Sequence, residues 1–422
     1  MFKDLLASLT NTAVFAESWA GYVDSLSVSS VVMTILTVFM LVGLIDKLRG
    51  NKLGYGERFD AGFQAMGDLA LAIVGIIAIS PVLLQLLVPV VTPFFKLIGA
   101  SPAMFPGAIL ALDMGGYAMA MQMADGNAAI GNYAGIIVAS MMGITVCFTI
   151  PYALTVIKKE DHRLFFIGVL LGIVMLPIGC LAGGLCMAFT STPLGFEELL
   201  INTLPVLILA VLVSVGLFFK LDLMLAIFSG FGKVVTFLAT FGLGVAIFQF
   251  LTGIRLPLFY LMVEHNEALG GKPFEVGLLL VGLIAIVLAG AFPFILFLNR
   301  RMGKIMEVLG GRLGINKEAS SGLLTQMASS IPVWSVINDM NQRGKLINVT
   351  FAISGSFVLG DVLAFTGGVN AEMVFPVIVA KLTGGILAIL LVYILLQKNV
   401  LRLPENEELQ NQGASAADIT EV

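Results

Sequence analysis

Long stretches without a single charged residue recur along this chain and restrict it to a membrane fold. Each stretch has about 20 residues or more, the length that an apolar helix needs to cross a bilayer. Charged residues make up only 12% of the 422 residues, against about 25% in soluble domains. The sequence therefore predicts an all-α polytopic membrane protein with about nine to eleven transmembrane segments. The seven clearest stretches are 25–45, 69–95, 126–157, 164–196, 199–219, 234–254 and 276–299.

Residues that could ligate a metal or carry out acid–base chemistry are scarce. The only histidines, His162 and His265, lie between apolar stretches. Cys147, Cys180 and Cys186 lie inside such stretches without a Cys-x-x-Cys spacing, so we interpret them as small packing residues. We therefore expect no metal, no cofactor and no catalytic residue. The net charge of −4 and the lack of a basic tract also predict no nucleic-acid partner.

Basic residues are concentrated in four loops, at 47–58, 158–163, 300–317 and 343–345. The positive-inside rule assigns such loops to the cytoplasm. If every apolar segment crossed the membrane once, the 158–163 loop would lie on the wrong side. A re-entrant hairpin at 104–124 removes this conflict, and a second hairpin at 318–340 keeps the last two loops on the same side. Two short spans divided at Pro81 would repair the first half equally well.

The two halves of the chain also resemble each other weakly, with matching features in the same order. If both hairpins are re-entrant, the halves have opposite orientations in the membrane. Inverted repeats of this kind build many secondary transporters, which bind their ligands near the membrane midplane. The prediction is then about nine spans and two hairpins, with the N-terminus outside and the C-terminus inside. The matches are Pro81 with Pro293, Ala100-Ser101 with Ala319-Ser320, Asp113-Met114 with Asp339-Met340, Asn132 and Ser140 with Asn348 and Ser356, and Gly183-Gly184 with Gly384-Gly385.

The resulting organisation has five parts. An aromatic and apolar helical face favours a position of the first part at the membrane interface. The last part is polar and acidic, with too few apolar residues to bury. The parts are an N-terminal interfacial segment (1–26), a first transmembrane half (27–189) that contains repeat 1 (62–189), connecting helices (190–273), repeat 2 (274–397) and a disordered acidic cytoplasmic tail (398–422).

Asp113 is the least expected residue for a membrane segment, because no other charge occurs in 97–124. A carboxylate at the bilayer centre costs about 2.5–3.5 kcal/mol on insertion scales. Gly115 and Gly116 follow it and favour a break in the helix, where backbone groups and a negative charge can face a polar ligand. The functional interpretation is a counter-ion for a cationic substrate or coupling ion. The alternative is a protonated or capped carboxylate that stabilises the hairpin.

Asp361 is the second candidate, because no other charge occurs in 346–371. A buried ion pair with Lys381, the one cation inside the last span, is an equally good explanation. Asp339 is weaker, because it precedes Arg343 by four residues. That spacing favours an ordinary ion pair on a helix surface.

Several polar and aromatic residues could complete a binding site around these carboxylates. Ser330 and Trp334 flank Pro332, which breaks the second hairpin as the glycine pair breaks the first. A ring of Tyr117 or Trp334 could lie over an ammonium group, although an interfacial aromatic is the commoner case. Hydrogen bonding between helices is likewise the commoner role of buried asparagine and serine. The candidate substrate-binding residues are Asp113, Asp361, Gly115, Gly116, Tyr117, Asn132, Ser330, Trp334, Asn338, Asp339 and Asn348.

Five stretches closely resemble the ethanolamine permease family of the bacterial ethanolamine-utilisation system. They are 65–72 (AMGDLALA), 112–116 (LDMGG), 176–184 (LPIGCLAGG), 343–361 (RGKLINVTFAISGSFVLGD) and 375–385 (FPVIVAKLTGG). The resemblance extends over about residues 27–397. It implies a secondary transporter or facilitator that imports ethanolamine across the bacterial cytoplasmic membrane, without enzymatic activity.

Ethanolamine is mainly cationic at neutral pH, so the resemblance implies a carboxylate for its ammonium group and a polar group for its hydroxyl. Asp113 and Asp361 would provide the first, and Asn132, Asn348 or Ser330 the second. A permease for a different small amine is one alternative. A membrane-embedded enzyme acting on a lipid head group is another, which the scarcity of histidine and of acidic clusters disfavours. A homo-oligomer is left open.

Overall fold

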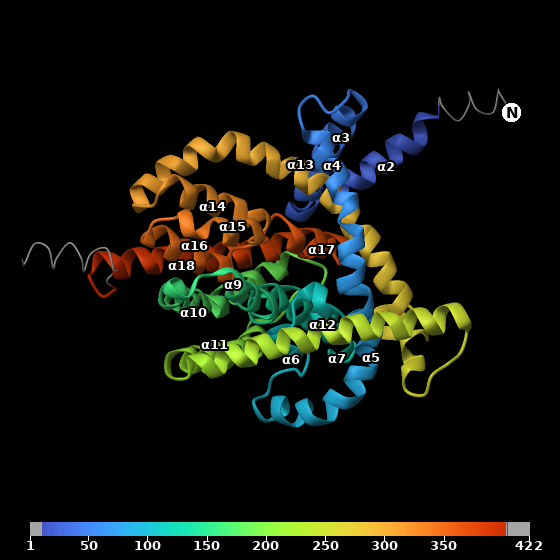
Figure 1. Cartoon of the computed structure of the whole chain (residues 1–422). Coiled ribbons are helices and arrows are strands. Elements are labelled where there is room, and N and C mark those ends of the chain that lie inside the picture. Colours follow the sequence, from blue (N-terminus) through green and yellow to red (C-terminus); the bar gives the residue numbers. More distant parts are fainter. Residues whose placement is uncertain (1–10, 402, 404–422) are drawn as a thin grey trace, which may run out of the picture.

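Helices form almost all of the computed structural model, which describes residues 11–401 and 403 (Figure 1). Within this part of the chain, eight helical segments are long and apolar enough to cross a membrane. The predicted all-α polytopic membrane fold is therefore confirmed. The segments are Val28–Leu48 (α3), Tyr55–Leu97 (α4 and α5), Ala128–Val156, His162–Phe189, Phe196–Phe219 (α11), Leu223–Thr252 (within α12), Pro273–Leu313 (α13) and Ala371–Gln397.

The long segment after α3 is formed by α4 (Tyr55–Gln64) and α5 (Met66–Leu97), and α5 continues through its prolines. Pro81 has no N–H for the Ile77 carbonyl, but the Ser80 hydroxyl donates to that carbonyl at 2.8 Å. The backbone group freed by the proline is thus satisfied inside the helix. The alternative prediction of two short spans divided at Pro81 is wrong.

The long helices form two groups (Figure 1). In the first group, α13 contacts α3, α4 and α5, α4 also contacts α3 and α5, and α12 (Leu221–Thr252) crosses α5. In the second group, α10 (His162–Cys186) contacts α11, α16 (Gln342–Ser354) and α18 (Val374–Gln397). This division matters because the candidate site lies between the two groups.

The 128–156 segment is the centre of the second group. Its most apolar window is 94% buried, against at most 61% for the other long segments. Two of its parts are wound as π-helix, a wide form that occurs often near functional sites. Its parts are α8 (Ala128–Asn132), η2 (Tyr133–Gly143), η3 (Thr145–Thr149) and α9 (Ile150–Val156), of which η2 and η3 are π-helical.

The hairpin predicted at 104–124 is present. It consists of α6 (Met104–Ile109), η1 (Leu112–Gly116) and α7 (Tyr117–Met123). Both ends of the hairpin are attached to the start of α11. The Ser101 N–H donates to Asn202 Oδ1 at 2.8 Å, and Asn127 Nδ2 donates to Glu198 Oε1 at 3.4 Å. The chain therefore returns to the side from which it entered.

The neighbours of this hairpin on the 128–156 segment reveal the same reversal. As the chain proceeds along α6, the residues of the segment that it contacts have increasing numbers. As it proceeds along α7, the contacted residues have decreasing numbers. Thus α6 runs parallel to the segment and α7 runs antiparallel, and the turn of the hairpin reaches the middle of the segment. The close pairs, in chain order, are Gly107 with Ala134 and, through its carbonyl, with Gly143; Leu110 with Gly143; Tyr117 with Gly135; and Met121 with Gly131.

The second predicted hairpin, at 318–340, is also present. It consists of α14 (Lys317–Ala328), α15 (Ile331–Val336) and η8 (Ile337–Asp339). Asn316 ties its ends together, because its Nδ2 donates to the Asp339 carbonyl at 2.8 Å and its Oδ1 accepts from the Asn341 N–H at 3.3 Å. Asp339 thus lies at the end of its hairpin, whereas Asp113 lies at the turn of the first. The two aspartates match in the sequence alignment of the halves, but they do not occupy equivalent positions in the two hairpins.

A break that we did not predict separates α16 from α17 (Asp361–Val369). The chain between them, 355–360, includes Phe357 at φ +64°. The N–H groups of Phe357 and Leu359 donate to carbonyls at the end of α14, at 2.8 and 2.7 Å. Counted with the eight long segments, this broken pair gives nine candidate crossings and two hairpins in the described chain, within the predicted range.

Contacts between loops define two ends of the molecule, one of which carries the four basic loops. At the basic end, Arg300 donates to the Leu53 carbonyl at 2.8 Å and Lys345 pairs with Asp161 at 2.7 Å. At the opposite end, loops join around Glu372. By the positive-inside rule we expect the basic end to lie in the cytoplasm, and this orientation stays a prediction; we call the opposite end the outer end. The two-fold relation of the halves and the domain boundaries stay predictions, and residues 1–10 and most of the predicted tail lie outside the described residues.

Candidate functional site

The turn of the first hairpin holds Asp113 in a conformation that depends on glycine. Gly115 has φ +94°, a region that residues with a Cβ rarely adopt. A Cβ on Gly115 would lie 2.9 Å from Ile76 Cγ1, and one on Gly116 would lie 2.6 Å from the Leu110 carbonyl oxygen. The glycine pair therefore breaks the helix, as predicted, and holds Asp113 at the tip of the hairpin.

Asp361 begins α17 directly after the second break. Its neighbour Gly360 packs so closely on α14 that a Cβ would lie 1.9 Å from the Ala328 carbonyl oxygen. A carboxylate in the first turn of a helix is stabilised by the partial positive charge of that end. This break thus fixes a second acidic side chain inside the membrane region.

The two carboxylates belong to one site. The η1 turn contacts α17, and the rings of Tyr117 and Phe365 lie 5.8 Å apart in an edge-to-face arrangement. The turn that carries Asp113 therefore lies beside the helix that begins at Asp361. The site also joins the two helix groups, because η1 contacts α5 and η2 while α17 contacts α13 and α18.

Neither carboxylate has a partner side chain. Within residues 11–401, no side chain donates a hydrogen bond to Asp113 or Asp361, and no lysine, arginine or histidine forms an ion pair with them. Both residues keep part of their surface accessible, although the adjacent Leu112 and Val362 are buried. An unpaired acidic group at this depth requires a bound cation or proton.

Cys147 is a buried packing residue, as predicted, but its position beside Asp113 was not evident from the sequence. Its Sγ lies 3.1 Å from the Ala111 N–H, which donates to it, and 3.8 Å from Met114 Sδ. The thiol thus packs against the chain on either side of Asp113, within an apolar setting. No group of three or more His, Cys, Asp or Glu side chains that could hold a metal comes together in the described part of the chain.

The predicted asparagines do not join this site. Asn132 donates to Thr192 Oγ1 at 3.1 Å, in a loop at the outer end. Asn348 accepts from Gln326 Nε2 at 2.6 Å, and its Nδ2 donates to two backbone carbonyls at 3.0 Å. These amides hold helices together, which was the alternative interpretation.

Ser330 and Trp334 bind each other instead of a ligand. Trp334 Nε1 donates to Ser330 Oγ at 3.2 Å, and the ring is 1% exposed. The ring packs edge-on against Phe165, with centroids 6.1 Å apart. Because the ring is buried, both predictions for Trp334 are wrong: its ring is not exposed at the membrane interface, and it has no ring face open to a ligand.

Asn338 and Asp339 are exposed in η8, at the basic end of the molecule. The predicted pair of Asp339 with Arg343 is not formed. The Arg343 guanidinium lies over the Tyr393 ring, 5.6 Å from its centroid. An extended residue, Met340, separates η8 from α16, so the two residues do not share a helix face.

Lys381 is fully buried but is not the partner of Asp361. Its Nζ donates to the Ser140 carbonyl, in η2, at 2.7 Å. The ion pair that we considered as an equal explanation for Asp361 is therefore wrong. This leaves the two aspartates together and without a counter-ion from the described residues.

Comparison with known proteins agrees with the resemblance of the sequence. Residues 28–395 match the family model described as "Ethanolamine utilisation protein, EutH". A Listeria monocytogenes protein named "Probable ethanolamine permease EutH" is 44% identical over 366 residues, covering 86% of this chain and 93% of that protein. A Salmonella typhimurium protein of the same name is 39% identical over 402 residues, covering 89% and 97%.

A Bacillus subtilis protein named "Uncharacterized protein YxeR" is 42% identical over 363 residues, covering 86% of this chain and 94% of that protein. No solved structure matches the chain significantly. The family model covers most of the chain, and the identities to its named members are 39–44%. This multi-pass bacterial membrane protein belongs to the EutH family of ethanolamine utilisation proteins.

Proposed function

We propose that this protein imports ethanolamine across the bacterial cytoplasmic membrane and that Asp113 and Asp361 hold the ammonium group of the substrate. The observation that carries the proposal is the pair of acidic side chains without a counter-ion, between the two helix groups. A primary ammonium group has three N–H donors and one positive charge, which two carboxylates can match.

The hydroxyl group of the substrate needs a different partner from those first predicted, because Asn132, Asn348 and Ser330 are engaged elsewhere. Tyr117 is the better candidate. It is partly exposed, follows the turn directly, and makes no side-chain hydrogen bond within residues 11–401. Its contact with Phe365 forms a wall that would limit the size of the amine.

Transport follows from the position of the site between the helix groups. If one group moves relative to the other, the same two carboxylates become accessible first from one side of the membrane and then from the other. The turn of the first hairpin and the break before α17 are the flexible points in this description. The chain then needs no chemical step on the substrate.

The test is uptake of radiolabelled ethanolamine into proteoliposomes. Asp113→Asn and Asp361→Asn should each lower kcat/KM about 100-fold, because loss of one partner from a buried charge pair costs roughly 2–5 kcal/mol. Asp339→Asn is the matched control, because Asp339 is exposed and distant from the turn. Normal saturable uptake by Asp113→Asn would exclude it as the counter-ion, and recovery of altered label would indicate an enzyme.

A further inference from the structure

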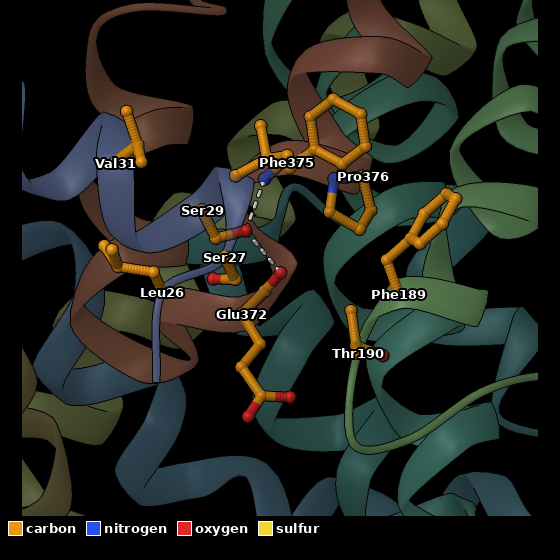
Figure 2. A pocket seen from close by; sticks show the side chains of 10 residues that line it. Leu26, Ser27, Ser29, Val31, Phe189, Thr190, Glu372, Phe375 and Pro376 are labelled. Carbon is orange, nitrogen blue, oxygen red and sulfur yellow. Dashed lines mark hydrogen bonds between the residues drawn. The ribbon is translucent and has the colours of Figure 1, made fainter. Parts of the chain in front are cut away.

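Two adjoining cavities open at the outer end of the molecule, between α3 and the second helix group. Figure 2 shows the side chains that line the first of them. Their volumes are about 630 and 440 Å³. Both are lined by Ser27, Ser29, Phe189 and Glu372, so they form one hollow, which we call the outer vestibule. It is separate from the Asp113 site, because none of its lining residues belongs to the hairpin turn or to α17.

Glu372 supplies a negative charge to this hollow. Its Oε2 accepts a hydrogen bond of 2.6 Å from the Ser191 N–H, which stabilises the ionised carboxylate. No lysine, arginine or histidine among residues 11–401 pairs with it. The Oε1 atom therefore remains available to a cation in the vestibule.

The backbone around Glu372 is fixed independently of its side chain (Figure 2). Ser29 Oγ donates to the Glu372 carbonyl at 2.7 Å and accepts from the Phe375 N–H at 3.1 Å. These bonds join α3 to the start of α18, and the carboxylate extends away from them (Figure 2). A change of the side chain should therefore leave this connection intact.

The remaining lining of the vestibule suits a small amino alcohol. Phe189 and Phe375 lie edge-to-face with centroids 6.4 Å apart, and Phe189 is 77% exposed. An aromatic face of this kind attracts a cation. Most residues that line the second cavity carry a hydroxyl group, Thr34 and Thr37 among them. One side of the hollow thus fits an ammonium group and the other fits an oxygen atom on a short arm.

The helix α2 (Thr12–Asp24) covers part of this polar side. Tyr22 and Ser25 line the second cavity, and the Tyr22 hydroxyl is hydrogen-bonded to Thr34. The family match begins at residue 28. The wall formed by these two residues therefore comes from the part of the chain that precedes the family region.

We propose that the outer vestibule is a capture site for a primary ammonium group on a short oxygen-bearing arm, with Glu372 as its counter-ion. The proposal rests on the proposed function, since the captured cation would pass on to Asp113 and Asp361. Free ethanolamine and the head group of phosphatidylethanolamine share this chemistry. The site concentrates the cation at the outer face, so it should affect uptake at low substrate concentration and not the maximal rate.

The first experiment compares uptake by Glu372→Gln and by Glu267→Gln, an exposed glutamate in another outer loop. At low ionic strength Glu372→Gln should raise KM about two- to fivefold with an unchanged maximal rate, and high salt should remove the difference. Glu372→Asp should restore most of the loss. Equal KM values for both glutamine variants and the unaltered protein would overturn the proposal.

A binding experiment separates this proposal from the proposed function. Equilibrium dialysis with labelled ethanolamine would use purified Asp113→Asn and the double variant that also carries Glu372→Gln. The single variant should keep weak binding that the double variant loses. Equal binding by the two variants would refute the capture site, even if the unaltered protein transports ethanolamine. A lack of uptake by the unaltered protein would refute the transport proposal but not the capture site.

The source of the ammonium group is distinguished by the lipid. Phosphatidylcholine lacks the N–H donors of phosphatidylethanolamine, and because the two lipids also differ in head-group size and packing, Glu372→Gln is measured in both lipids as the control. A lipid head group in the vestibule would raise the KM of the unaltered protein in phosphatidylethanolamine and leave that of Glu372→Gln unchanged. The same KM in both lipids would assign the vestibule to free ethanolamine.

Discussion

Gly115→Ala tests whether the shape of the hairpin turn controls substrate binding. An alanine at φ +94° costs about 1–2 kcal/mol in backbone strain. Its Cβ would also lie 2.9 Å from Ile76 Cγ1, well inside the usual carbon separation of about 3.5–4.0 Å. Displacement of Ile76 from its rotamer adds roughly 0.5–1.5 kcal/mol. The native turn should thus lose about 2–3 kcal/mol of stability relative to displaced turns.

The assay is ethanolamine uptake in proteoliposomes, with protein content matched by immunoblot. If binding requires the native turn, a loss of 2–3 kcal/mol lowers kcat/KM by about 30- to 140-fold. Gly67→Ala is the matched control, because no neighbouring atom lies within 4 Å of its added Cβ and its φ is not positive. Uptake by Gly115→Ala within twofold of that by Gly67→Ala would refute the reasoning.

Three further variants test other parts of the structure. Gly360→Ala should abolish uptake, because its Cβ would lie 1.9 Å from the Ala328 carbonyl oxygen; normal uptake would contradict the close packing at this break. In a double-mutant cycle of apparent Tm, Lys381→Met and Asp361→Asn should be additive, whereas coupling of more than about 0.5 kcal/mol would indicate an ion pair. Asn316→Ala should speed hydrogen exchange in the second hairpin, since it removes bonds worth about 1 kcal/mol each; unchanged exchange would contradict its role.

Loop charges were the strongest information in the sequence about the fold. They predicted both hairpins, because each loop must lie on a definite side of the membrane and the number of crossings between loops is then limited. The same count cannot detect the break at 355–360. A broken crossing and an unbroken one connect the same two sides, and the bonds that hold this break come from α14, distant in sequence.

The site was predicted in part. Asp113 and Asp361 were identified because an isolated charge in an apolar stretch is costly wherever it lies. The role of Trp334 was not predicted, and interhelical hydrogen bonding was only the alternative for Asn348, because sequence spacing gives neither the depth nor the partners of a side chain. The predicted pair of Asp339 with Arg343 was wrong for a different reason. The i, i+4 rule applies within one continuous helix, and the extended Met340 separates the two residues.

The depth of the first hairpin has an electrical consequence. Its turn reaches Gly143, near the middle of the 128–156 segment. A cation that arrives at Asp113 from outside has then crossed about half of the membrane. Moving one elementary charge across the whole membrane at a transmembrane potential of 100 mV changes its free energy by about 2.3 kcal/mol. Binding of a cation at mid-depth therefore gains roughly half of that amount. An inside-negative voltage should therefore increase the affinity for an external ammonium ion, even before any helix moves.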